Sequence, residues 1–185
     1  MKKAMILLAD GFEELEAIAV HDVLCRTHAC QADFVGTMGA LAVRTSRGFF
    51  VQAHALLEMV DPASYDFLVL PGGKLGVENL KKNEKVISLI QSFHEEGKGT
   101  YAICAAPSIL GELGFLDGHD YTCFPGFQKG KGRYREKGVV ADGPCITGRS
   151  MAYSIPFAEE IARKELGEEA LKSAFPGMYG GLREE

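Results

Sequence analysis

The sequence predicts an α/β fold in which helices cover both faces of a mostly parallel sheet. Two observations support this prediction. Short apolar runs alternate along the chain with segments of helical periodicity. The runs are apolar throughout rather than at every second residue, which is typical of strands that are buried on both faces. Strands that alternate with helices favour parallel pairing.

The first apolar run, residues 2–9, reads as a buried strand that ends at Asp10 and Gly11. The segment 13–26 then has the period of a helix. Its predicted apolar face consists of Leu15, Ile18, Ala19, Val23 and Leu24.

A second strand is expected at 31–37, followed by a small β-hairpin at 40–53. The hairpin turn is Ser46-Arg47-Gly48. Residues 65–73 form the next buried strand, which ends in a proline and two glycines.

A helix is predicted at 84–96, where Gly97 stops it. The segment 99–104 is the next strand and 106–113 the next helix. The remaining expected elements are three weaker strands at 121–123, 139–141 and 145–147, and two helices at 154–164 and 168–174.

Length and composition suggest one domain over residues 1–185. The chain has 46% apolar residues, and no stretch rich in Ser, Gly or Pro divides it. A net charge of -5 argues against a general nucleic-acid binder. The apolar run 4–9 is too short for a signal peptide, and no stretch is long enough to span a bilayer. We therefore expect a cytoplasmic protein with no membrane contact.

The five cysteines are expected to be free thiols. They are odd in number, scattered and without CxxC spacing, which fits neither a disulfide framework nor a zinc site. The five histidines also lack metal-ligand spacing, so no metal is predicted.

Three predicted strand ends carry candidate functional residues: "ADGFEELE", "LPGGKLG" and "ICAAP". In open parallel sheets the ligand site lies beyond the carboxyl ends of the strands, near a switch in strand order. These three segments are therefore expected to meet.

Cys104 lies where the strand 99–104 passes into a helix. A nucleophile on such a turn needs small residues two positions before and after it, and here these are Ala102 and Ala106. Pro107 suits the first turn of the helix. The helix dipole and free backbone N–H groups would favour the thiolate. The alternative is a small buried thiol with a packing role, which is common for free cysteine.

Glu13, Glu14 and Glu16 stand at the start of the first helix. Acidic residues there often only complement the helix dipole on a solvated face, a role that fits Glu13 or Glu14. Glu16 could instead turn toward the sheet end, where burial would raise the pKa of its carboxyl and allow it to exchange a proton with a thiolate.

Gly72 and Gly73 end the strand 65–73. The pair could form a plain turn. Alternatively, their backbone N–H groups could face an oxyanion beside the nucleophile.

Taken together, "LADGFEELEA", "VLPGG", "AICAAP" and "ITGRS" resemble the ThiJ/PfpI superfamily, specifically its DJ-one branch, over nearly the whole chain. The resemblance implies a flavodoxin-like three-layer α/β sandwich related to class I glutamine amidotransferases, and a homodimer. It also implies that Cys104 is the reactive cysteine and Glu16 its partner, with the backbone of Gly72, Gly73 and Ala105 beside them.

The resemblance further implies roles for four charged residues. Arg47 and Arg149 match arginines near the pocket. Arg26 and Asp22 correspond to polar residues near the dimer interface.

The sequence also departs from the family pattern. Ala105 replaces the histidine that follows the cysteine in PfpI-type proteases, which argues against a Cys-His protease. Phe124 stands where a DJ-one histidine lies, and His119 is displaced from that place. "TGRSMAY" replaces "TSRGPGT", which changes the surroundings of Arg149. Cys123 is either a second pocket thiol or a core cysteine.

The resemblance implies one of two functions, neither of which needs a cofactor. As a glyoxalase or deglycase, Cys104 would attack a small α-oxoaldehyde while Glu16 moves a proton. As an oxidative-stress sensor or redox-regulated chaperone, Cys104 would be oxidised by peroxide and Glu16 would stabilise the sulfinate. The expected partners are thus a small aldehyde or a peroxide, and a second copy of the chain.

Overall fold

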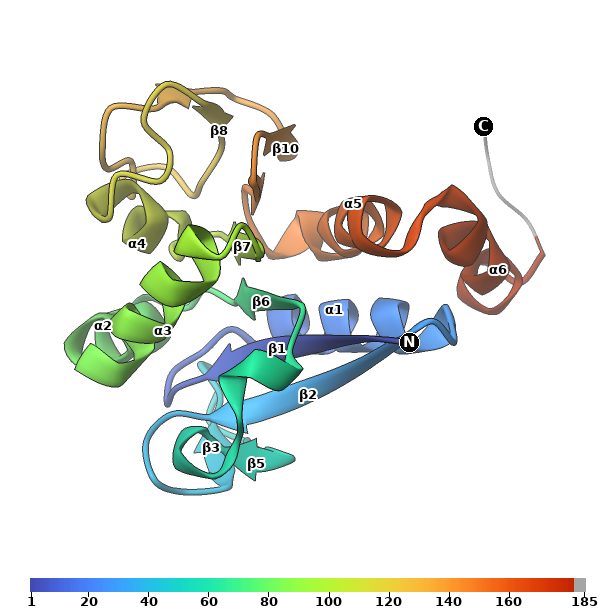
Figure 1. Ribbon diagram of the computed structural model, residues 1–185, viewed down its shortest axis with the longest axis horizontal. Helices are drawn as coiled ribbons and strands as arrows, with labels where there is room; N and C mark the ends of the chain where they lie inside the picture. Colours follow the sequence, from blue (N-terminus) through green and yellow to red (C-terminus); the bar gives the residue numbers. More distant parts are fainter. Residues whose placement is uncertain (182–185) are drawn as a thin grey trace.

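The computed structural model describes residues 1–181; residues 182–185 of the predicted domain lie outside the described part. A seven-stranded sheet forms the centre of the fold, with the order β10-β11-β7-β6-β1-β2-β5 (Figure 1). All neighbours pair in parallel except β10 and β11. The strands are β1 (Lys2–Leu8), β2 (Cys30–Gly36), β5 (Ala55–Leu56), β6 (Phe67–Leu70), β7 (Gly99–Ile103), β10 (Val139–Asp142) and β11 (Cys145–Gly148).

Helices cover both faces of this sheet, as predicted. One layer consists of α1 (Glu14–Arg26), α5 (Ser154–Leu166) and α6 (Glu168–Tyr179). The other consists of α2 (Lys74–Lys82), α3 (Glu84–Glu95) and α4 (Pro107–Glu112). Figure 1 shows these two groups on different sides of the strands. The flavodoxin-like α/β sandwich is therefore confirmed.

The alternation of side chains along β1 builds one core on each face of the sheet. Ala4, Ile6 and Leu8 pack in the core under α1 and α5, whereas Met5 and Leu7 pack in the core under α2 and α3. All five are fully buried. Burial on both faces explains why this strand is apolar throughout.

The predicted hairpin is present as β3 (Ala42–Arg44) and β4 (Phe50–Gln52), which pair antiparallel. The predicted strand at 121–123 is wrong beyond Tyr121, because β8 covers only Asp120–Tyr121 and pairs with β9 (Arg133–Tyr134). Short 3-10 turns complete the elements, at Leu57–Met59, Pro62–Ser64 and Met151–Tyr153.

The structure corrects the predicted apolar face of α1. Leu15 and Ile18 are 48% and 39% exposed. The helix instead buries the stripe Glu16, Ala17, Val20, Val23 and Leu24. Glu14 is buried as well, so the solvated position expected for it is wrong. This stripe follows helical spacing once Glu16 is counted among the inward residues. The helix is thus rotated so that a carboxyl, and not Leu15, faces the sheet.

The rotation of α1 predicts which of its residues stabilise the fold. Leu24 is fully buried, so Leu24→Ala should lower the free energy of unfolding by about 2–5 kcal/mol through lost burial and a residual cavity. Leu75→Ala is the matched control, because Leu75 is 53% exposed on α2 and its loss should change stability by less than about 1 kcal/mol. Urea unfolding measures both. Equal, small losses in the two variants would contradict the packing described here.

Candidate active site

The three strand-end segments come together at one edge of the sheet. β7, β6 and β1 are adjacent and parallel, so the segments that follow them emerge side by side. Cys104 follows β7, Gly72 and Gly73 follow β6, and Glu16 lies in the first turn of the helix after β1. The expected meeting of these residues is therefore found.

Cys104 occupies a strained turn. Its φ of 64° lies in the left-handed region, which among described non-glycine residues only His28 shares. Two hydrogen bonds hold the turn: Cys104 N donates to Gly148 O at 2.9 Å, and Phe124 N donates to Cys104 O at 2.8 Å. Such strained turns between strand and helix present a nucleophile at the end of a sheet.

Small residues are required around this turn. Ala102 and Ala106 are fully buried. A Cβ on Gly72 would lie 2.7 Å from both Cys104 Cβ and Glu16 Oε2, so only glycine allows this approach. Gly72 is therefore needed for space as well as for its N–H group.

Glu16 is fully buried and held by backbone groups. Gly72 N donates to Glu16 Oε2 at 2.7 Å, while Glu16 Oε1 is buried without a hydrogen-bond partner. Glu13 caps the helix by accepting from Glu16 N at 2.9 Å. The sequence did not indicate this cap, because the usual capping signal has Ser, Thr, Asp or Asn in place of Glu13.

The environment shifts the pKa of both side chains upward. Burial, and next the charge of Glu13, raise the pKa of Glu16 to about 7, although the hydrogen bond from the N–H group of Gly72 lowers it. Burial also raises the pKa of Cys104, and the charge of Glu16 adds to this. The N–H groups of Gly73 and Ala105 act in the opposite direction by stabilising the thiolate. The expected preference for the thiolate is therefore wrong for the resting protein, because burial and Glu16 outweigh the two amides and raise the pKa of Cys104. The helix that follows, α4, is only six residues long.

The pair is poised to hold one proton between carboxyl and sulfur. Two negative charges in this buried site repel each other, so ionisation of one group favours the protonated form of the other. When Glu16 is protonated, it becomes a hydrogen-bond donor and its repulsion of the thiolate disappears. A proton can then pass to or from a bound molecule at neutral pH.

The turn at Cys104 is surrounded by Arg149, Cys123 and Phe124. Within the described part of the chain, none of these residues forms a hydrogen bond with the Cys104 sulfur. Arg149 Nη1 donates to Tyr134 Oη at 2.8 Å and lowers the pKa of Cys123 electrostatically, although burial raises that pKa to about 11. Cys123 is fully buried, which fits the core reading of this thiol. Phe124 is 45% exposed and packs edge-on against Phe127.

Arg47 is exposed in the hairpin turn and acts electrostatically on Glu13. Asp22 and Arg26 form an exposed ion pair of 2.6 Å farther along α1. They line a groove of about 270 Å³ that also includes Leu15, Ile18 and Ile155. They are thus placed on an outer surface of the helix and not at the cysteine.

His119 lies at the opposite end of the sheet from Cys104. Its Nδ1 is 3.4 Å from Asp142 Oδ1, and Asp142 pairs with Cys145 at the start of β11. Because β11 runs parallel to β7 with Cys145 beside Thr100, this end is remote from Cys104. His119 therefore has no place in the chemistry of the cysteine.

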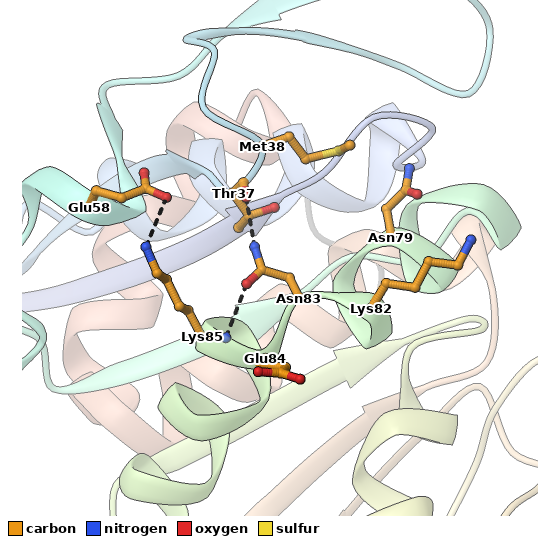
Figure 2. A pocket seen from close by; sticks show the side chains of 8 residues that line it. All are labelled: Thr37, Met38, Glu58, Asn79, Lys82, Asn83, Glu84 and Lys85. Atoms are coloured by element: carbon orange, nitrogen blue, oxygen red, sulfur yellow. Dashed lines mark hydrogen bonds and ion pairs between the residues drawn. The ribbon is translucent and has the colours of Figure 1, made fainter.

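A cavity of about 650 Å³ between α2, α3 and the loop after β2 is polar and open (Figure 2). Asn83 organises it by donating to Thr37 O at 2.8 Å and capping α3. Lys85 and Glu58 form an ion pair of 3.8 Å across it. None of its lining residues belongs to the cysteine site.

The described residues contain no group of three or more His, Cys, Asp or Glu side chains placed to hold a metal ion. Nor does any helix in the described chain have the length and apolar character needed to cross a bilayer. All five cysteines are free.

The raised pKa of Glu16 predicts how stability depends on pH. Between its ordinary value of 4.5 and about 7, the folded protein binds more protons than the unfolded chain, so wild-type stability falls as pH rises. Glu16→Gln removes this titration. As pH rises through this range, the free energy of unfolding of the variant should increase by up to about 3 kcal/mol relative to that of wild type. Urea unfolding from pH 4.5 to 8 measures the difference; parallel curves would show that Glu16 has an ordinary pKa.

The comparisons with known proteins agree with this geometry. The model of the DJ-1/PfpI family matches residues 2–164. The chain is 32% identical to Protein dj-1beta of Drosophila melanogaster, covering 96% of each, and 31% identical to Deglycase TK1284 of Thermococcus kodakarensis, covering 80% of this chain and 89% of that protein. It is 37% identical to Protein DJ-1 homolog B of Arabidopsis thaliana over 89% of this chain, but spans only 38% of that longer protein.

A solved structure shows the same fold. The DJ-1 superfamily protein STM1931 of Salmonella typhimurium superposes with a TM-score of 0.90 at 32% identity, covering 97% of this chain and 98% of that chain. With the family model matched over most of its length and Cys104, Glu16 and Gly72 brought together at one sheet edge, the chain belongs to the DJ-1/PfpI family.

Proposed function

We propose that the protein is a cofactor-independent glyoxalase or deglycase that acts on small α-oxoaldehydes or their adducts. One observation carries this proposal: the fully buried Glu16 carboxyl lies beside the thiol of Cys104 and interacts with it directly. A nucleophile and an acid/base group with a pKa near 7 are what aldehyde chemistry of this kind requires. The name of the deglycase relative supports the proposal.

The reaction begins when the Cys104 thiolate attacks the aldehyde carbon and forms a hemithioacetal. The proton held by Glu16 passes to the new alkoxide. The resulting Glu16 carboxylate then removes the proton from the aldehyde carbon, which gives an enediol, and returns it to the neighbouring carbon. The hydroxyl proton passes at the same time from the first oxygen to the second, so that the product is a thioester with a 2-hydroxyl group. Water hydrolyses the thioester, releases a 2-hydroxy acid and restores the thiol. The N–H groups of Gly73 and Ala105 stabilise negative charge at the sulfur.

This mechanism predicts a specific pattern of activity. Wild-type protein should convert methylglyoxal to lactate, whereas Cys104→Ala should abolish turnover. Glu16→Gln should lower kcat by about 10²-fold or more, because proton transfer is lost. The matched control is Cys25→Ala, which removes a half-buried thiol elsewhere and should keep full activity. Lactate is measured enzymatically. Absence of lactate with reduced wild-type protein, or equal rates in wild type and Cys104→Ala, would refute the proposal.

The second candidate function is an oxidative-stress sensor or redox-regulated chaperone that uses the same cysteine. Exposure leaves two candidate thiols, because Cys104 and Cys25 are half-buried whereas Cys30, Cys123 and Cys145 are buried. Of these two, Cys104 is the one that lies beside a carboxyl, Glu16, able to stabilise an oxidised sulfur. We propose that in a reducing cytoplasm the free thiol is oxidised by peroxide to sulfenate and then sulfinate, which a protonated Glu16 stabilises by hydrogen bonding.

Selective oxidation tests this second function. Mild peroxide should add two oxygen atoms at Cys104, and Glu16→Gln should reduce the share of sulfinate because the acidic donor is lost. Peptide mass spectrometry measures the gain at each cysteine. Oxygen gained equally at Cys25 and Cys104 would argue against a sensing role.

We also propose that two copies associate through the outward face of α1. Leu15, Ile18 and Ile155 are 48%, 39% and 49% exposed and line one groove with the Asp22–Arg26 ion pair. Burying this apolar surface would favour association. Ile18→Asp should then give a monomer in sedimentation experiments, with unchanged far-UV circular dichroism. A monomeric wild type would refute the proposal.

A further inference from the structure

A second cavity lies beside the cysteine site, between the hairpin turn and the start of α2. It has a volume of about 510 Å³. Three segments form its walls: the loop after β1, the turn between β3 and β4, and the first residues of α2. Its main lining residues are Asp10, Gly11, Arg44, Thr45, Arg47 and Lys74.

Three cations line this cavity without partners of their own. Within the described part of the chain, the side chains of Arg44, Arg47 and Lys74 make no hydrogen bond and no ion pair within 4 Å. Such a concentration is unusual in a chain with a net charge of -5. Converging unpaired cations in a concave site create a positive potential that attracts an anion.

The nearby carboxyl groups are occupied by other donors. Asp10, which also lines the cavity, accepts from Arg44 N at 2.9 Å through Oδ1. Glu14 Oε2 accepts from Ser46 Oγ at 2.8 Å. Glu13 caps α1 and interacts with Arg47 only electrostatically. These acids reduce the positive potential but do not neutralise the three cations by direct pairing.

Thr45 adds a polar group that lacks a partner. It lines the cavity, is only 3% exposed, and its Oγ1 is buried without a hydrogen bond. A buried hydroxyl left unsatisfied costs about 1–3 kcal/mol.

The cavity and the cysteine site are built on adjacent residues of one chain segment. Gly73 presents its N–H group to Cys104, and Lys74 follows it directly as the first residue of α2. Glu13 N donates to Gly72 O at 3.0 Å, and a Cβ on Gly73 would lie 2.3 Å from Gly11 O. The loop that lines the cavity is therefore packed against the glycine pair that contacts the sulfur.

We propose that this cavity is an oxyanion subsite that selects α-oxoaldehydes whose far end carries a carboxylate or phosphate group. The proposal rests on the proposed aldehyde chemistry at Cys104 and adds the substrate class. Arg44, Arg47 and Lys74 bind the anionic end with charge-assisted hydrogen bonds, while the aldehyde carbon is directed to the sulfur. Arg44 and Lys74 determine specificity and take no part in the proton transfers.

The first experiment measures anion binding and needs no enzyme activity. Inorganic phosphate is titrated at constant ionic strength, because salt screens exposed charges, and the backbone amide shifts of Gly11, Gly48 and Leu75 are followed by NMR. Wild type should show saturable shifts. The double variant Arg44→Gln/Lys74→Gln should bind phosphate at least about tenfold more weakly than wild type. Lys82→Gln is the control, since Lys82 lies at the far end of the same helix in the other cavity (Figure 2). Identical titrations in all three proteins would overturn the proposal.

The second experiment measures selectivity with two substrates of equal chain length. One is 4,5-dioxopentanoate, which ends in a carboxylate, and the other is the neutral 2-oxopentanal. Wild type should prefer the anionic substrate by about tenfold in kcat/KM, and the double variant should lose this preference while keeping its rate on 2-oxopentanal. Equal kcat/KM values in wild type would exclude the subsite as a selector of carboxylates, and competition by phosphate then tests the phosphate arm.

The two experiments separate failure of the subsite from failure of the enzyme. If neither aldehyde is consumed but phosphate binding depends on Arg44 and Lys74, the aldehyde chemistry is wrong and the anion site stands. If both aldehydes are consumed equally and phosphate causes no saturable shift, the chemistry stands and the subsite is wrong.

Discussion

The burial of the Glu16 carboxyl beside the Cys104 sulfur is the constraint on which the rest of the site depends. A charged carboxylate in that position is unfavourable, and one hydrogen bond from Gly72 N at 2.7 Å only partly offsets the lost hydration. The pKa of Glu16 therefore rises to about 7, and the carboxyl becomes able to give up or accept a proton at neutral pH. The thiolate form of Cys104 is stabilised by two backbone N–H groups, those of Gly73 and Ala105, although burial and Glu16 outweigh them.

Several features of the fold serve this contact. The rotation of α1 directs Glu16 inward and leaves Leu15 and Ile18 exposed. Glycine at position 72 lets the end of β6 approach the side chains of Cys104 and Glu16. The backbone of Cys104 takes the left-handed conformation at the end of β7. The exposed face that results on α1 is the surface through which we propose that two copies associate. The same rotation of α1 thus positions Glu16 and exposes this face.

The sequence predicted the sheet well because buried parallel strands are apolar throughout, as in β1 and β6. It also identified Cys104, Glu16 and Gly72 as neighbours, since strand ends of a parallel sheet share an edge. The apolar face of α1 was mispredicted because a glutamate occupies an inward position, which hydrophobic periodicity treats as polar. The cation-lined cavity was missed, because Arg44 and Lys74 are distant in sequence and only the packing of the hairpin turn on α2 brings them together.

The central claim is that Glu16 titrates near neutral pH because it is buried beside Cys104. A direct test is the ¹³C chemical shift of its carboxyl carbon, followed by NMR from pH 4 to 9 in reduced protein. The account predicts a midpoint near pH 7, and a lower midpoint in Glu13→Gln, because the charge of Glu13 raises the pKa of Glu16. A midpoint near the ordinary value of 4.5 in both proteins would contradict it.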